Sequence, residues 1–146
     1  MKYQQGKFFP LNEDKYIGDP TKIRHLSSWE RHLMKYLDTH KDVLRWNSED
    51  FIVPYISPLD GKKHRYLVDF FVELNTKNGI QKRAIEVKPR AETKAPRRGK
   101  NLKSYERKMK TYIVNRAKWK AASSFCKDRG VQFMIMTEYD LGIKKC

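Results

Sequence analysis

Apolar and polar residues alternate most regularly between Arg65 and Lys88. The run RYLVDFFVEL passes through the polar stretch NTKNG into IQKRAIEVK. Two alternating runs around an Asn-Gly dipeptide predict a β-hairpin, because this dipeptide favours the tight turns that join antiparallel strands. Successive side chains of a strand point to opposite faces, so we expect Asp69 to share a face with Leu67 and Phe71. The opposite face then carries Tyr66, Val68, Phe70 and Val72.

The register of this hairpin depends on the length of its loop. A two-residue loop opposes Asp69 to Lys88, whereas a four-residue loop opposes Asp69 to Glu86. In both registers the three side chains share one face, where neighbours lie about 4.5–8 Å apart. A loop of three or five residues would move Asp69 to the other face. The pattern therefore favours two acids and a lysine on one side of the sheet.

An amphipathic helix is predicted ahead of the hairpin. Ser27 and Ser28 offer N-caps, and the helical spacing of apolar residues continues to about Thr39. Glu30 occupies the first position of the apolar stripe. A carboxylate that faces the core requires a partner, whereas an acid in the first turn is stabilised by the helix dipole. The spacing supports both interpretations of Glu30 equally.

Shorter apolar runs predict the remaining strands. Residues 43–46 and 51–56 indicate two short strands, and Pro54 marks an edge or an irregular position. The nearly continuous apolar run VQFMIMT, at 131–137, predicts a strand covered on both faces. Residues 1–26 are basic, aromatic and interrupted by proline and glycine, so we expect an irregular arm.

A long helix is predicted from about Ser104 to Arg129, where Gly130 ends it. Between hairpin and helix, residues 89–103 carry six positive charges, one negative charge, two prolines and a glycine, which indicates a loop. The tail at 141–146 is expected to be peripheral. The order helix, four strands, helix, strand predicts an α/β fold in which helices flank one sheet.

The length of 146 residues is typical of one domain with a real core. Neither an internal repeat nor a change of composition marks a second domain. We therefore expect residues 1–146 to form a single domain that includes the basic arm and the basic loop.

The composition favours a polyanionic partner. Lys and Arg number 32 against 17 acids, which gives a net charge of +15, and 8 Tyr, 7 Phe and 3 Trp accompany them. This excess favours nucleic acid as the partner. No apolar run approaches the ~18 residues of a membrane span, and the first residues lack the apolar core of a signal peptide. Cys126 and Cys146 form no metal-ligand spacing and are typical of a reducing compartment.

Two basic segments are candidates for contact with DNA phosphates. The loop contributes Arg97, Arg98 and Lys100, and the long helix contributes Arg116, Lys118 and Lys120. Charged runs are often only solvated, and this alternative stays open.

The pattern Glu-x-Lys occurs at Glu13, Glu86, Glu92 and Glu106. Only Glu86 lies in an apolar strand, and only Glu86 has a partner strand that bears an acid, Asp69. Mg²⁺ typically takes one or two carboxylates in addition to waters and substrate phosphate. The context of Glu86 therefore indicates a candidate metal site.

Phosphodiester hydrolysis suits these groups. Asp69 and Glu86 would hold Mg²⁺, and the backbone carbonyl of Val87 could supply a further oxygen. Lys88 would orient or deprotonate the attacking water and screen charge in the transition state. Glu30 would complete the acidic cluster, and hold a second ion, if its helix packs across this face. The alternative is a surface ion-pair network worth about 0.2–1 kcal/mol per pair.

These residues resemble the motif of the PD-(D/E)xK restriction-endonuclease-like superfamily. Asp69 is followed after sixteen intervening residues by Glu86-x-Lys88, and the helical Glu30 precedes them. One departure is Val68, which stands where the name of the superfamily expects proline.

A narrower resemblance covers roughly residues 16–138. The segments SSWE, VLRWNSEDFIVPY, RYLVDFFVEL, AIEVKP and NRAKWKAASSFCKDRGVQFMIMTE are similar to the TnsA-type endonuclease domain, and to the head-completion nucleases of tailed phages. This resemblance implies a restriction-endonuclease-like core, with a mixed sheet flanked by helices. It also implies a Mg²⁺-dependent DNA endonuclease in which Mn²⁺ can substitute.

The same resemblance implies roles and partners. Asp69, Glu86 and Lys88 would occupy the motif positions, and Glu30 the acid position of the first helix. The protein would act late in capsid maturation, after DNA packaging and before the tail joins. Its partners would be DNA and capsid, portal or neck proteins, with no membrane, in the host cytoplasm during assembly or in the virion head. No oligomeric state is implied.

Two other functions are compatible with this sequence. A non-catalytic DNA-binding virion protein could keep the fold, although binding alone does not require acids that face phosphates. A repair or junction-resolving nuclease on the same fold would carry the same three residues.

Overall fold

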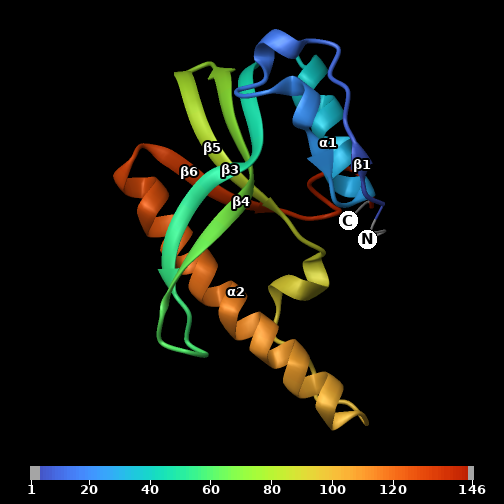
Figure 1. Ribbon diagram of the computed structural model, residues 1–146, viewed down its shortest axis with the longest axis vertical. Coiled ribbons are helices and arrows are strands. Elements are labelled where there is room, and N and C mark those ends of the chain that lie inside the picture. The colour runs from blue at the N-terminus through green and yellow to red at the C-terminus, as the bar shows by residue number, and fades with distance from the viewer. Residues whose placement is uncertain (1–3, 145–146) are drawn as a thin grey trace.

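The computed structural model describes residues 4–144, and these form one main sheet of four strands (Figure 1). The strand order is β3-β4-β5-β6, in which β5 and β6 are parallel and the other neighbours are antiparallel. The α/β class with a mixed sheet is therefore confirmed. The strands are β3 (Val43–Ile56), β4 (Lys63–Thr76), β5 (Gly79–Val87) and β6 (Val131–Met136).

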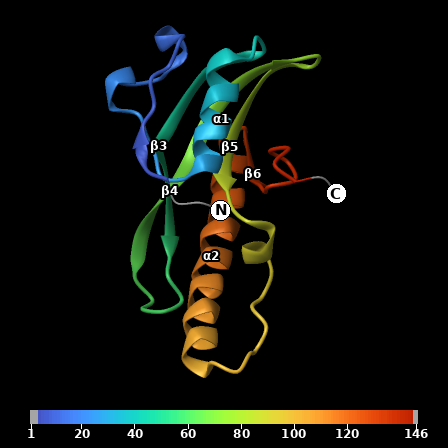
Figure 2. The ribbon, with the colours of Figure 1, turned by 90° about the vertical axis from the view of Figure 1, so that its right-hand side faces the viewer.

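Helices cover both faces of this sheet. α1 (Ser28–Thr39) packs on one face and α2 (Leu102–Asp128) on the other. The side chains of Ser27 and Asn101 cap these helices by accepting the backbone N–H three residues further on. Because Asn101 supplies a cap, α2 begins before the expected Ser104. Figure 2 shows that the first half of α2 extends beyond the sheet, with the preceding chain beside it. Within residues 4–144, no helix combines the length and apolar character needed to cross a membrane.

The tail after β6 contributes to the core. Leu141 is only 8% exposed and belongs to the apolar cluster under α1. Its backbone carbonyl lies 3.1 Å from Nε2 of His32 in α1, and its N–H donates to the carbonyl of Thr137. The prediction that the tail is peripheral is therefore wrong for Leu141, because the turn after β6 folds back onto α1. Residues 145–146 of the expected tail lie outside the described residues.

The two short strands expected at 43–46 and 51–56 are one continuous strand, β3. Its register with β4 shifts between Ser48 and Phe51, which is the signature of a β-bulge. Glu49, inside the bulge, has a positive φ of 54°. β3 is an edge strand and contains Pro54, as the sequence predicts.

The β4–β5 hairpin has the register expected for a four-residue loop. Phe71 pairs with Ala84, and the last pair before the turn is Thr76 with Gly79. Asp69 therefore lies opposite Glu86, and the register that opposes Asp69 to Lys88 is wrong. The turn is stabilised by the Thr76 hydroxyl, which donates to the Gly79 carbonyl at 2.7 Å. Gly79 has φ 103°, a conformation that glycine adopts without steric cost.

The faces of β4 change sides at Asp69. Tyr66 and Val68 pack in the apolar cluster under α2, whereas Phe70 and Val72 pack in the cluster under α1. The expectation that these four residues share one face is therefore wrong. Phe70 is the last residue of β4 that pairs with β5, and β4 continues beside β3 past the bulge. A bulge increases the local twist, so the faces of the strand rotate relative to the helices.

The N-terminal arm contains more regular structure than expected. Two short strands pair antiparallel, and two 3₁₀ turns lie between them. These elements are β1 (Gly6–Lys7), η1 (Glu13–Lys15), η2 (Pro20–Lys22) and β2 (Arg24–His25). The expected residues 1–3 of the arm lie outside the described residues.

Asp38 fixes the arm to α1. Its side chain is 2% exposed and accepts the backbone N–H groups of Leu11 at 2.8 Å and Asn12 at 3.0 Å. The Asn12 amide donates in return to the Asp38 carbonyl at 2.8 Å. These donors satisfy a carboxylate that would otherwise be costly to bury.

The basic loop is fixed at its beginning. It starts with the 3₁₀ turn η3 (Arg90–Thr93), and the Arg90 N–H donates to the buried carboxylate of Glu138 at 2.7 Å. The Arg90 guanidinium also lies 5.1 Å from the ring centre of Tyr139. The start of the loop is therefore attached to the segment that follows β6.

Asp38→Ala should destabilise the fold by about 2–4 kcal/mol, because the two backbone N–H groups that fix the arm lose a charged acceptor. Asp14→Ala removes an exposed acid of the same arm and should change the free energy of unfolding by less than about 0.5 kcal/mol. Denaturant unfolding, followed by tryptophan fluorescence, measures both variants. Equal stability of the two would contradict the role of Asp38.

Candidate active site

Asp69 and Glu86 face each other where β4 and β5 separate. The paired part of the ladder ends at Phe70 and Ile85. Immediately beyond it, Oδ2 of Asp69 accepts the Val87 N–H at 2.8 Å, and Oε1 of Glu86 accepts the Asp69 N–H at 3.4 Å. Each carboxylate therefore binds the backbone of the opposite strand, and these bonds fix both acids at the end of the ladder.

Glu86 is 6% exposed and has two further neighbours. The Tyr66 hydroxyl donates to its Oε1 at 2.8 Å, and the Lys88 ammonium lies 3.7 Å from its Oε2. Lys88 remains partly open to solvent, with 26% of its side chain exposed. The structure thus brings Asp69, Glu86 and Lys88 together.

The electrostatics of this pair disfavour two negative charges. Burial raises the pKa of Asp69, and the charge of Glu86 raises it further, against the hydrogen bond from Val87. Burial also raises the pKa of Glu86, although Lys88 and Tyr66 oppose this. The pKa of Tyr66 is raised by burial and then by the charge of Glu86, so its hydroxyl stays a donor. A cation placed between the carboxylates would relieve their repulsion.

Glu30 lies at the N-terminal end of α1, half-buried. Its Oε1 accepts the Leu26 N–H at 3.3 Å, and its Oε2 is 3.5 Å from the Ser27 hydroxyl. Burial raises its pKa, and the charges of Glu49 and Glu86 raise it further. Both interpretations of Glu30 therefore apply, because it is a first-turn acid that also lies near the other carboxylates.

The donor set suits a hard divalent cation. Oδ1 of Asp69 and Oε2 of Glu86 accept no hydrogen bond from residues 4–144, and the nearest cation to Oε2 is the Lys88 ammonium at 3.7 Å. Carboxylate oxygens are preferred by Mg²⁺ and Mn²⁺. Within the same part of the chain, no three His, Cys, Asp or Glu side chains converge on one point. A divalent cation here would therefore be bound by the carboxylates of Asp69 and Glu86 together with water and phosphate oxygens. Glu30 lies outside this set of ligands.

Lys118 of α2 points toward the carboxylate pair. Its ammonium lies 5.5 Å from the ring centre of Tyr66 and 5.8 Å from that of Tyr55. Its charge also opposes the burial that raises the pKa of Glu86. Lys118 is thus part of the surroundings of the site.

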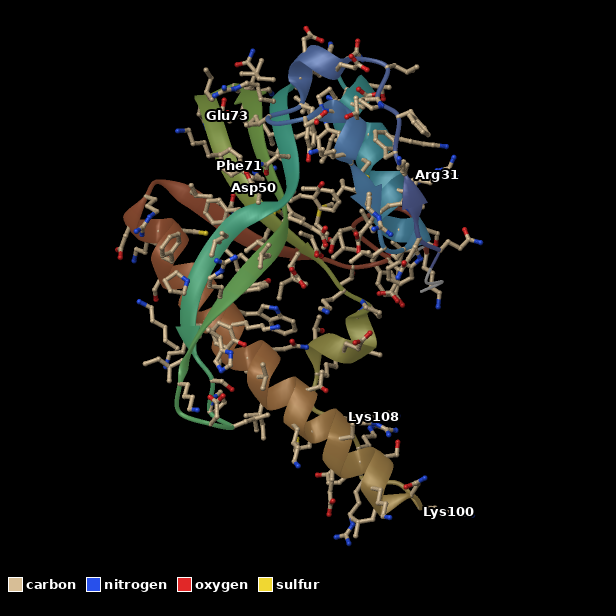
Figure 3. All side chains as sticks on the ribbon, viewed as in Figure 1. Arg31, Asp50, Phe71, Glu73, Lys100 and Lys108 are labelled. Carbon is tan, nitrogen blue, oxygen red and sulfur yellow. The ribbon has the colours of Figure 1, made fainter. Side chains whose placement is uncertain are left out.

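The other cations expected to contact DNA lie elsewhere. Arg116 and Lys120 are exposed around a hollow on the β6 side of α2. The loop cations Arg97, Arg98 and Lys100 are exposed beside the projecting half of α2, where Figure 3 labels the last of them. The helix face expected from sequence is therefore divided between two sides of α2.

Tyr66 is a site residue that the sequence did not indicate. Strict alternation places it on the face opposite Asp69, but the twist of β4 turns it to Glu86. No glycine marks the bulge behind this twist, since the residue with positive φ there is Glu49. The local sequence pattern therefore does not predict that Tyr66 reaches Glu86.

Comparison with known proteins agrees with this geometry. The sequence model of a family described as TnsA-like endonuclease N terminal matches residues 40–138. This range contains the carboxylates of Asp69 and Glu86 and the lysines Lys88 and Lys118. A known relative, the head completion nuclease of Enterobacteria phage T4, is 38% identical over 138 residues, which cover 91% of this chain and 90% of the relative. Both findings confirm the resemblance carried by the motif segments. The chain therefore belongs to the TnsA-like endonuclease family.

Proposed function

We propose that this protein is a Mg²⁺-dependent DNA endonuclease that acts in the completion of a phage head, with Mn²⁺ as a substitute metal. The observation that carries this proposal is the pair of the partly buried Asp69 and the buried Glu86, two carboxylates with raised pKa values beside Lys88. Membership of an endonuclease family supports hydrolysis of DNA phosphodiester bonds, and the name of the T4 relative supports the stage at which it acts.

Asp69 and Glu86 would hold the metal ion through Oδ1 and Oε2, with the Val87 carbonyl as a further candidate ligand. Bound Mg²⁺ would acidify the attacking water and stabilise the charge that develops on the phosphate. Glu30, which lies outside this ligand set, would contribute to a second ion on the α1 side.

Protein donors hold the two carboxylates in place. The Val87 N–H fixes Oδ2 of Asp69, and the Tyr66 hydroxyl fixes Oε1 of Glu86, so the remaining oxygen of each acid has a defined direction. Lys88 lies too far from Glu86 for a close hydrogen bond, and its ammonium is available to a phosphate oxygen or to the attacking water. An ion-pair network worth about 0.2–1 kcal/mol per pair would not offset the cost of burying two like charges, which is several kcal/mol per ion.

We propose that the basic loop and α2 hold the DNA. Arg97, Arg98 and Lys100 are exposed together on the loop, and Arg116, Lys118 and Lys120 lie along α2. The further partners would be capsid, portal or neck proteins, in the host cytoplasm during assembly or in the virion head.

Glu86→Gln should reduce plasmid cleavage with Mg²⁺ or Mn²⁺ by more than about 100-fold, because a metal ligand is lost. Glutamine keeps an oxygen that accepts from Tyr66, so the fold should be retained. DNA binding should be unchanged or tighter, since a charge that repels phosphate is gone. Glu13→Gln, at an exposed Glu-x-Lys pattern far from the site, is the matched control and should cut as wild type does. Cleavage by Glu86→Gln at the wild-type rate would refute the assignment.

Asp69→Asn should raise the melting temperature at pH 7 in the absence of divalent metal, by about 2–4 °C for each kcal/mol gained. Because the pKa of Asp69 is raised, ionising this group costs more free energy in the folded than in the unfolded protein. The cost lowers the free energy of unfolding as pH rises above about 4, the ordinary pKa of aspartate. The neutral amide of asparagine removes this cost. The difference between variant and wild type should therefore vanish below that pH.

The same pair of proteins tests the metal directly. Mg²⁺ should raise the melting temperature of wild type, since a ligand that binds only the folded state stabilises it. It should raise that of Asp69→Asn much less. An equal rise in both would show that Mg²⁺ does not bind at Asp69.

Replacing Arg97, Arg98 and Lys100 together by glutamine should weaken DNA binding. The slope of log affinity against log salt should become less steep by about 0.9 for each phosphate that the loop no longer neutralises. The control replaces three lysines near the β4–β5 turn, Lys41, Lys77 and Lys82, by glutamine. It should keep the wild-type slope. Fluorescence anisotropy with a labelled duplex measures both slopes, and an unchanged slope in the loop variant would exclude the loop from the interface.

A further inference from the structure

A groove runs between the projecting half of α2 and the turn that joins β3 to β4. Its volume is about 450 Å³, and Leu59 of the turn forms one wall. The other wall is α2, which contributes four cations and one acid, Glu106. The cations are Lys103, Arg107, Lys110 and Lys118.

These cations follow one stripe of the helix. Lys103, Arg107 and Lys110 are spaced i, i+4 and i+7, which places them on the same side of α2. With a rise of about 1.5 Å per residue, Lys103 and Lys118 are separated by roughly 22 Å along the axis. This length corresponds to about six nucleotides of one strand at 3.4 Å each.

The positive charge of the stripe is not neutralised within the protein. None of the ion pairs formed by residues 4–144 includes Lys103, Arg107, Lys110 or Lys118. Lys103 and Arg107 repel each other because like charges four residues apart on a helix are unfavourable, and Glu106 is the single acid of the groove that offsets this. A polyanion in the groove would reduce this repulsion.

Lys118, at the inner end of the groove, links it to the carboxylate pair through Tyr66. Lys118 lies over Tyr66, and Tyr66 donates to Glu86. Asn115, one turn earlier on α2, is 7% exposed and lines the same groove. A second hollow faces the basic loop and includes Arg97. It shares Arg107, Thr111 and Asn115 with the groove but does not include Lys118. The groove therefore has a connection to the site that the loop side lacks.

We propose that this groove binds the sugar–phosphate backbone of one DNA strand and leads it to Asp69 and Glu86, with Lys118 on the phosphate nearest the bond that is cut. The inference rests on the proposed function and adds the path of the substrate. Figure 3 shows the projecting end of α2, marked by Lys100 and Lys108, well separated from Glu73 of β4. The path therefore extends away from the β4–β5 turn.

The test replaces Lys103, Arg107 and Lys110 together by glutamine, a residue with good helix propensity. Binding of a labelled 20-base-pair duplex is measured by anisotropy between 50 and 200 mM salt, with EDTA present so that no cleavage occurs. The slope of log affinity against log salt should become less steep by about 2.7, so that over this range wild type loses about 40-fold more affinity than the variant. Arg107→Gln alone should reduce the slope by about 0.9, and circular dichroism confirms that both variants keep their helix.

The control removes the same three charges at the other end of the molecule, at Lys41, Lys77 and Lys82. Its slope should equal that of wild type. A wild-type slope in the groove variant would overturn the inference, and so would an equal fall in the control, since net charge would then account for binding. Plasmid cleavage separates this result from the proposed function. If wild type cuts the plasmid but the groove variant keeps the wild-type slope, only the groove is refuted. If the groove variant has the less steep slope but wild type never cuts, only the nuclease function is refuted.

Discussion

The main constraint on the site is that two like charges are held close together, largely shielded from water. Asp69 and Glu86 lie at the end of the β4–β5 ladder, and each accepts a backbone N–H from the opposite strand. Their repulsion and their burial raise the pKa of both, so the arrangement is unfavourable unless other groups fix it. The N–H bonds, the Tyr66 hydroxyl and the ammonium groups of Lys88 and Lys118 provide this support. Such a pair has little structural advantage over apolar residues, which is why its presence points to chemistry rather than to stability.

The elements of the fold follow local rules, and for this reason the sequence predicts most of them. The hairpin, both helices and the last strand are encoded in periodicity and in N-caps such as Ser27. The shared face of Asp69 and Glu86 follows from alternation and register alone. What alternation misses is the rotation of β4 at Asp69, because it arises from the pairing of β4 with a bulged β3 and from its separation from β5. Tyr66 therefore reaches Glu86 from a position that strict alternation assigns to the other face, and the part that each site residue plays in catalysis remains a prediction.

The net charge of the chain is unevenly placed with respect to the site. On α2, Lys118 is half-buried over two tyrosine rings, whereas Arg116 and Lys120 are exposed on the opposite side of the helix. A helix of this length has several faces, so a count of charges in sequence cannot show which of them meets the sheet. Burial and the contacts of each side chain distinguish the cation beside the carboxylates from the cations that lie farther from them.

The hydrogen bond between Arg90 and Glu138 separates two parts of the chain mechanically. Lys88 is followed by a proline and then by Arg90, whose N–H is held by a buried carboxylate beyond β6. Movement of the loop beyond η3 would therefore not be transmitted to Lys88. If the loop binds DNA as proposed, its outer part would change shape while the backbone of Lys88 keeps its place beside β6.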